Sequence, residues 1–136
     1  MIGGATQADV AILVVNATSG EFETGMQLVG GQTQEHARLT RLLGVSRLIV
    51  VVNKMDTVDW SRARFEEIRA TMTTMLKTLN QPDVVFCPVS GLYGVNLVHA
   101  SSIPPERDIR RLAPWYDGPC LIDIIGEFFC LNLRSH

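Results

Sequence analysis

The stretch Leu48-Ile49-Val50-Val51-Val52, followed directly by Asn53-Lys54-Met55-Asp56, decides the fold of this chain. An unbroken apolar run with polar residues after it is typical of a strand buried on both faces, as in parallel sheets. Open α/β sheets bind their ligands at the carboxyl ends of such strands. The polar residues after Val52 therefore lie where a ligand site is expected.

The side chains from Asn53 to Asp56 suit the recognition of a guanine base. The carboxylate of Asp56 can accept hydrogen bonds from the N1–H and the 2-amino group of guanine, whereas adenine lacks that amino group and has an acceptor at N1. Lys54 can lay its methylene stem over the base, and Asn53 can connect neighbouring loops through its amide. The alternative is an ordinary strand followed by the polar N-terminus of a helix.

A second apolar run, Val84-Val85-Phe86-Cys87-Pro88-Val89, predicts another strand and ends in Ser90-Gly91-Leu92. Backbone N–H groups of this loop can bind the guanine carbonyl oxygen O6, and Gly91 permits a close approach. Taken alone, Ser90 and Gly91 are equally typical of a routine turn. Because this loop lies one helix and one strand after Asp56, we favour a nucleotide site that both loops form.

The rest of the chain alternates between strand and helix patterns. Residues 9–16 form a further continuous apolar run and predict a first buried strand. Helices are predicted at 32–43, at 60–79 and at 121–129, a loop at 17–31 and an irregular segment at 99–118. Right-handed crossovers then give an α/β fold of three layers, a parallel sheet with helices on both faces.

Several single residues carry expectations of their own. Asp59 is expected to cap the helix at 60–79, and Gly44 to take the left-handed position after the helix at 32–43. Met72 and Met75 recur on an apolar helix face and are expected in the core. Trp115 and Tyr116 are expected to hold the irregular segment on the domain, and residues 2–8 to end a helix. Glu21, Glu23 and His36 are expected at the surface, with a contact to a partner as the alternative.

Composition excludes several classes of protein. The chain has 136 residues, 46% hydrophobic and 19% charged, which fits one globular domain. Its net charge of −2 provides no basic field for nucleic acid or membranes, and no apolar run is long enough to cross a bilayer. Met1 to Ala5 lack the basic residues of a secretory signal. The cysteines Cys87, Cys120 and Cys130 lack C-x-x-C spacing and predict reduced packing residues in a cytoplasmic protein.

Recognition of phosphate is missing from the sequence. No G-x-x-x-x-G-K-[ST] loop is present, although this loop is what cradles the phosphates of a nucleotide. Asp123-Ile124-Ile125-Gly126 fits a D-x-x-G pattern, but it lies in a predicted apolar helix after both base-reading loops. We interpret it as a chance match.

Ordered blocks along the chain nevertheless resemble the translational GTPases of the elongation factor Tu/1-alpha superfamily. Within that group the chain is most similar to the eukaryotic peptide-chain release factor GTP-binding subunit, followed by ribosome-rescue relatives and elongation factor 1-alpha. The blocks include Gly20-Glu21-Phe22-Glu23-Thr24-Gly25, Gly30-Gly31-Gln32-Thr33-Gln34-Glu35-His36, Val52-Asn53-Lys54-Met55-Asp56, Ser90-Gly91-Leu92-Tyr93-Gly94-Val95-Asn96-Leu97 and Pro114-Trp115-Tyr116. Asn16 stands where an aspartate is usual in that family.

The resemblance implies a partial P-loop GTPase fold, with residues 1–126 as the C-terminal half of a GTP-binding domain and 127–136 as an unmatched tail. The phosphate loop, the first switch and the D-x-x-G segment are expected upstream of Met1. The parent is expected to bind GTP or GDP with Mg²⁺, and to hydrolyse GTP on the ribosome with a stop-codon-reading release factor. Guanine is assigned to Asn53, Lys54, Asp56, Ser90, Gly91 and Leu92, and no residue here is assigned to catalysis or metal.

Two other functions stay open. The chain can be a non-catalytic truncated module that binds a release-factor partner or the ribosome. It can also be an unrelated α/β nucleotide enzyme with a chance N-K-x-D. The resemblance also implies that the strand at 10–15 lies beside the phosphate-loop strand in the family's sheet. Without that strand its long apolar edge is exposed, which predicts that the isolated chain self-associates, aggregates or is only marginally stable.

Overall fold

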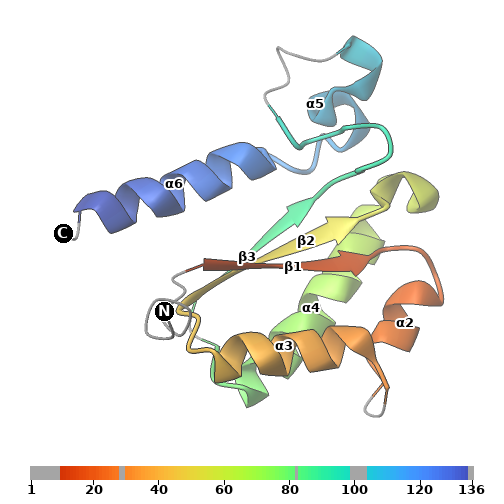
Figure 1. Ribbon diagram of the computed structural model, residues 1–136. Coiled ribbons are helices and arrows are strands. Elements are labelled where there is room, and N and C mark those ends of the chain that lie inside the picture. The colour runs from red at the N-terminus through yellow and green to blue at the C-terminus, as the bar shows by residue number, and fades with distance from the viewer. Residues whose placement is uncertain (1–9, 28–29, 82, 99–103, 135–136) are drawn as a thin grey trace.

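The chain folds around a parallel sheet of three strands (Figure 1). The computed structural model describes residues 10–27, 30–81, 83–98 and 104–134, with side chains as far as residue 127. The strands are β1 (Val10–Asn16), β2 (Arg47–Asn53) and β3 (Asp83–Pro88), in the order β1-β2-β3. These bounds agree within one residue with the predicted strands.

The register of the sheet brings the strand ends together. Asn16 at the end of β1 pairs with Asn53, and Val52 pairs with Pro88 of β3. Because all three strands are parallel, the loops that follow them leave from the same edge of the sheet. The loops after β2 and β3 are therefore neighbours, as the sequence predicts.

Helices cover both faces of the sheet, which confirms the three-layer α/β fold. Leu48, Val50 and Val52 of β2 pack with Ala37 of α3 (Gln32–Leu42) and with the apolar side of α4 (Arg62–Thr78). Ile49 and Val51 point to the opposite face, where they pack against Ile124 of α6 (Leu121–Arg134). Successive side chains of a strand alternate between faces, so one continuous apolar run supplies both cores. Figure 1 shows α3 and α4 on one side of the sheet and α6 on the other.

The long helix α4 packs as predicted but begins differently. Met72 and Met75 are buried in the core, which confirms the prediction for both residues. The N-cap of α4 is Ser61, whose hydroxyl accepts a hydrogen bond from the Arg64 N–H. The prediction that Asp59 caps this helix is therefore wrong. A short 3₁₀ turn, η1 (Met55–Val58), lies between β2 and α4, and Asp59 ends it with a left-handed backbone.

Short helices occupy segments that the sequence predicts as loops. The segment 17–31 contains α2 (Glu21–Gly25), and the segment 99–118 contains η3 (Pro105–Arg107) and α5 (Ile109–Leu112). Gly44 follows α3 with φ 77°, as expected. Asp123 lies within α6, so the D-x-x-G match is helical there. The predicted helix end at 2–8 lies outside the described residues.

Trp115 and Tyr116 hold the segment before α6 on the domain, as predicted. The Trp115 indole donates a hydrogen bond of 2.9 Å to the backbone oxygen of Trp60, and its ring packs against Phe65 at a centroid distance of 5.2 Å. Tyr116 packs against the same core, and its hydroxyl donates to the backbone oxygen of Pro119 at 2.6 Å within the segment. No helix in the described part of the chain has the length and apolar character that crossing a bilayer requires.

Candidate functional site

Backbone hydrogen bonds join the two loops that were predicted to form the site. The Val89 N–H donates to the oxygen of Val52 at 2.9 Å, and the Met55 N–H donates to the oxygen of Val89 at 3.2 Å. The segment after β3 thus continues the parallel pairing beyond the strand itself. The polar residues of both loops are consequently held at one edge of the sheet.

Asp56 and Ser90 are in direct contact. The Ser90 hydroxyl donates to Asp56 Oδ1 at 2.8 Å, and Ser90 is fully buried whereas Asp56 is half-buried. Among the described residues no donor reaches Asp56 Oδ2. One carboxylate oxygen is thus fixed by the protein, and both oxygens keep lone pairs for further donors.

Asn53 connects the same two loops. Its Oδ1 accepts a hydrogen bond of 2.9 Å from the Gly91 N–H, which is the connecting role that its amide suggests. A Cβ built on Gly91 would lie 3.4 Å from Asn53 Oδ1, an ordinary contact. The loop itself therefore tolerates a side chain at this position. A requirement for glycine must come from a bound base, and that role of Gly91 stays a prediction.

Lys54 and Leu92 bring large exposed surfaces to this edge. Lys54 has a left-handed backbone, with φ 60° and ψ 31°, and its side chain is partly exposed. Leu92 is 82% exposed in the loop after Ser90. An exposed leucine and the methylene stem of a lysine are the kinds of surface that pack on a flat base.

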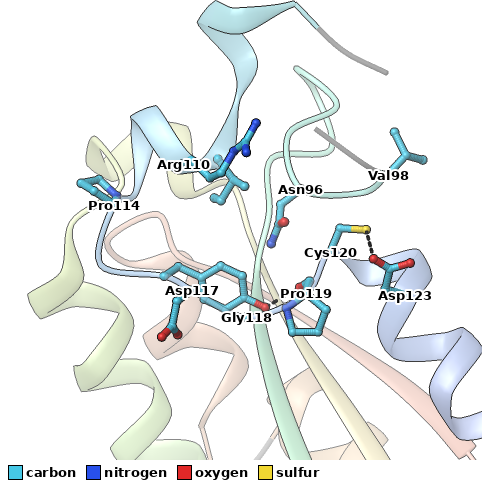
Figure 2. Close-up of a pocket in the computed structure, with 11 residues that line it drawn as sticks. Asn96, Val98, Arg110, Pro114, Asp117, Gly118, Pro119, Cys120 and Asp123 are labelled. Carbon is cyan, nitrogen blue, oxygen red and sulfur yellow. Dashed lines mark hydrogen bonds between the residues drawn. The ribbon is translucent and has the colours of Figure 1, made fainter. Parts of the chain in front are cut away.

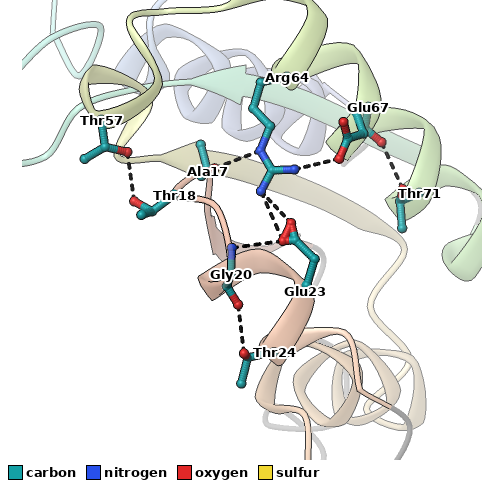
Figure 3. A network of polar contacts seen from close by, with 9 residues as sticks. All are labelled: Ala17, Thr18, Gly20, Glu23, Thr24, Thr57, Arg64, Glu67 and Thr71. Atoms are coloured by element: carbon teal, nitrogen blue, oxygen red, sulfur yellow. Dashed lines mark hydrogen bonds and ion pairs between the residues drawn. The ribbon is translucent and has the colours of Figure 1, made fainter.

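Arg64 links the start of α4 to the loop after β1 (Figure 3). Its Nε donates to the backbone oxygen of Ala17 at 2.9 Å, and its two terminal nitrogens pair with Glu67 at 2.6 Å and Glu23 at 2.7 Å. Its guanidinium carbon also lies 5.6 Å from the ring centre of Phe22. These contacts hold α2 against the body of the domain.

Glu21 and Glu23 are exposed, as expected, but they lie in a helix and not in a loop. Both belong to α2 and pair with basic residues distant in sequence, Glu21 with Lys54 and Glu23 with Arg64. Bonding to Lys54 lowers the pKa of Glu21, and bonding to Arg64 lowers the pKa of Glu23. Both side chains are therefore carboxylates at neutral pH. Sequence patterns missed this pair because they do not indicate α2, the short helix that carries Glu21.

Asn96 supports the loop after β3, a role that was not among the sequence predictions. Its side chain is buried and donates a hydrogen bond of 2.9 Å to the backbone oxygen of Pro88, at the end of β3. Ser90 and Val95 exchange backbone hydrogen bonds, which closes the loop between them. Asn96 has φ 63°, and asparagine tolerates this left-handed conformation. An asparagine shortly after Gly94 was therefore the sequence signal for this turn.

A cavity of about 480 Å³ lies on the α6 side of this loop (Figure 2). Asn96, Tyr116 and Cys120 are among the residues that line it. Burial raises the pKa of Cys120, and it raises the pKa of the neighbouring Cys87 to about 12. Both thiols are free and stay protonated at neutral pH, so they are packing residues, as predicted for them. Cys130 lies beyond the described side chains.

The other candidate positions lie around the end of β1. His36 is exposed at the rim of a cavity of about 690 Å³ that Asn16, Gly20 and Thr33 also line. Its surface position is as expected, and a contact with another domain stays a prediction. No group of three or more His, Cys, Asp or Glu side chains in the described ranges is placed to hold a metal ion.

The sequence profile of the elongation factor Tu GTP binding domain matches residues 1–128. The chain is 52% identical over 130 aligned positions to Protein HBS1 of Drosophila melanogaster, and 44% identical over 138 positions to the eukaryotic peptide chain release factor GTP-binding subunit of Candida albicans. These alignments cover 94% and 98% of this chain but only 18% of each relative. The chain thus spans about a fifth of the length of these relatives.

Solved structures agree with these matches. The structure of sup35 complexed with GDP superposes with a TM-score of 0.76 at 39% identity, over 90% of this chain and 29% of that one, and its complex with GMPPNP gives the same values. The chain therefore belongs to the translational GTPases that share the elongation factor Tu GTP-binding domain.

Proposed function

We propose that the loops after β2 and β3 bind the guanine base of GTP or GDP. Asp56 accepts the N1–H and the 2-amino group, Lys54 and Leu92 lie against the faces of the base, and the backbone after Ser90 meets O6. Asn53 and Gly91 hold the two loops at the right distance. The observation that carries this proposal is the hydrogen bond of 2.8 Å between Ser90 and Asp56, since it fixes the selective carboxylate beside the second loop.

Selectivity follows from hydrogen-bond chemistry. A site built around donors of its ligand rejects an analogue that lacks them, because its own acceptor is then left unpaired. Adenine offers no donor at N1 and no 2-amino group. Asp56 therefore penalises adenine and favours guanine, while the packing surfaces of Lys54 and Leu92 accept either purine.

Exchange of one acceptor for a donor tests the proposal. In Asp56→Asn the new amide N–H faces the 2-carbonyl of xanthine. Preference should therefore move from GDP to xanthosine diphosphate by at least roughly tenfold, which is the factor that one hydrogen bond to a charged group corresponds to. Titration of both nucleotides, followed by NMR or calorimetry, measures this ratio. Asp59→Asn is the matched control, because Asp59 is exposed and three residues away. Unchanged selectivity in Asp56→Asn would contradict the assignment.

The wider role that we propose is that of a guanine-nucleotide-binding portion of a cytoplasmic translation factor. Two relatives are named as a release factor subunit and an elongation factor, which supports a role in termination or elongation on the ribosome, with a stop-codon-reading release factor as the partner in termination. The sequence contains no phosphate loop, so we expect this chain to bind guanine nucleosides with little GTP turnover. Turnover at the rate of a complete GTPase would contradict this expectation.

A further inference from the structure

Glu21 reaches across the sheet edge to one of the residues assigned to the base. Its Oε1 lies 2.8 Å from Lys54 Nζ, and the Asn16 amide donates to the same oxygen at 3.4 Å. Glu21 comes from α2, after β1, whereas Lys54 comes from the loop after β2. The ion pair therefore joins a third strand end to the two that form the proposed base site.

The position of Glu21 does not depend on Lys54. Phe22, the next residue, is 4% exposed in the core, and Glu23 is held by Arg64 and by the Gly20 N–H at 3.1 Å. The burial of Phe22 and the ion pair between Glu23 and Arg64 thus fix the α2 turn. Glu21 consequently presents its carboxylate from a rigid support.

The backbone of Lys54 is also held, whereas its side chain has only one polar partner in the described part of the chain. Thr57 Oγ1 donates to the Lys54 oxygen at 2.6 Å, and Thr57 in turn contacts Thr18 Oγ1 at 2.8 Å. The Lys54 ammonium contacts Glu21. The four-carbon stem is thus held at its backbone end and has a charged partner at its other end, which restricts its freedom before any ligand arrives.

We propose that Glu21 is a positioning residue for guanine-nucleoside binding: it holds the ammonium of Lys54, so that the stem of Lys54 is already placed to pack on the base. This inference rests on the proposed function of the two loops. It further specifies that Lys54 acts through apolar contact, since Glu21 neutralises its charge. Preorganising a flexible side chain lowers the entropy that binding must remove.

The variant Glu21→Gln tests this proposal, because glutamine keeps the size and removes the charge. Exposed ion pairs correspond to factors of roughly two to five in an equilibrium constant, so the Kd should rise about two- to fivefold for both guanosine and GDP. The equal effect on guanosine, which has no phosphate, separates positioning from a change in the overall charge of the domain. Glu66→Gln is the matched control, since Glu66 is a surface carboxylate paired with Arg69 at 3.7 Å on α4.

A double-mutant cycle measures the coupling between Glu21 and Lys54 in the Kd for guanosine. A purely structural role of Glu21 would not produce such coupling. Lys54→Met keeps the apolar stem and removes the ammonium, so Glu21→Gln should have no further effect on the Kd when combined with it. Fully additive effects, or an unchanged Kd for guanosine in Glu21→Gln, would overturn the proposal. Far-UV circular dichroism on each variant confirms that the domain is folded.

Failure of this inference is distinguishable from failure of the base site itself. Asp56→Ala should abolish guanosine binding if the two loops bind guanine. If Asp56→Ala abolishes binding while Glu21→Gln changes nothing, only the positioning role is wrong. If Asp56→Ala leaves the Kd for guanosine unchanged, the proposed function fails, and the role of Glu21 fails with it.

Discussion

The hydroxyl of Ser90 is the single group that most distinguishes this site from an ordinary pair of turns. It is fully buried, donates to Asp56 at 2.8 Å and accepts from the Tyr93 N–H at 3.4 Å. Ser90 thereby gives the half-buried carboxylate of Asp56 a defined direction.

Removal of this hydroxyl should weaken both the fold and the site. Ser90→Ala is expected to lower the free energy of unfolding by about 1–2 kcal/mol, because hydrogen bonds to charged groups contribute about 1.5–3 kcal/mol and Asp56 is still partly hydrated. Urea denaturation measures this change. Discrimination between guanosine and adenosine should also decrease, since the Asp56 carboxylate is then free to rotate.

Ser19→Ala serves as the control for Ser90→Ala. Ser19 is exposed in the loop after β1, and exposed substitutions of this kind usually change stability by less than about 0.5 kcal/mol. Equal stability of the wild-type protein and Ser90→Ala, with unchanged base selectivity, would show that the contact between Ser90 and Asp56 has no energetic role.

At the scale of elements, α2 depends on a side chain outside it. The helix has five residues, a length at which isolated helices do not form in water. Its stability therefore comes from tertiary contacts, chiefly the buried Phe22 and the ion pair between Glu23 and Arg64. Any change that loosens α2 should be transmitted to Glu21 and from there to Lys54.

The variant Arg64→Met is expected to loosen this element. Methionine retains an apolar stem beside Phe22 but leaves the backbone oxygen of Ala17, a fully buried residue, without its donor. Losing such a bond should lower the free energy of unfolding by roughly 1–3 kcal/mol. Amide hydrogen exchange should accelerate in residues 17–25 more than in α3 or β2.

Arg69→Met is the matched control on the same helix. Arg69 is more than half exposed and contacts Glu66 at 3.7 Å, a type of surface pair that contributes little. If amide exchange in residues 17–25 is equally fast in Arg64→Met and Arg69→Met, Arg64 does not hold α2.

The elements that the sequence predicts well are those that local pattern specifies. β1, β2 and β3 are continuous apolar runs, and burial on both faces requires such runs in a parallel sheet. α2 and the cap of α4 depend on geometry instead. The turn η1 places a left-handed Asp59 before the helix, so that Ser61 begins it, and no periodicity in the sequence marks this turn.

Within the candidate site, too, some residues could be predicted from the sequence and others could not. Asn53, Asp56, Ser90 and Gly91 follow predicted strands, and the parallel register brings them together without further information. The contribution of Glu21 comes from a strand end 33 residues away and from a helix that sequence patterns do not indicate. Contacts between loops that follow paired strands can thus be predicted, whereas a contact from a helix that no pattern indicates cannot.

At the scale of the whole molecule, the two faces of the sheet are covered unequally. On the side of α3 and α4, Leu13 and Val15 of β1 are 3% and 2% exposed. On the side of α6, Ile12 and Val14 of the same strand are 46% and 53% exposed, because α6 packs mainly over β2 and β3. β1 pairs only with β2 among the described residues, so its other edge also presents free backbone groups.

We expect this edge and its apolar face to drive association of the isolated chain, since an unprotected apolar edge strand is a template for pairing with another chain. Sedimentation velocity should show a species whose mass increases with protein concentration.

Ile12→Lys places a charge beside the edge, where lysine is a common natural protection, and should shift the population toward monomer. Leu42→Lys is the control, because Leu42 is 84% exposed on α3, which covers the face of the sheet opposite to α6. Edge pairing requires that Ile12→Lys disperses the assembly and Leu42→Lys does not. A wild-type chain that stays monomeric at all concentrations, or equal dispersal by both variants, would show that β1 does not act as an open edge.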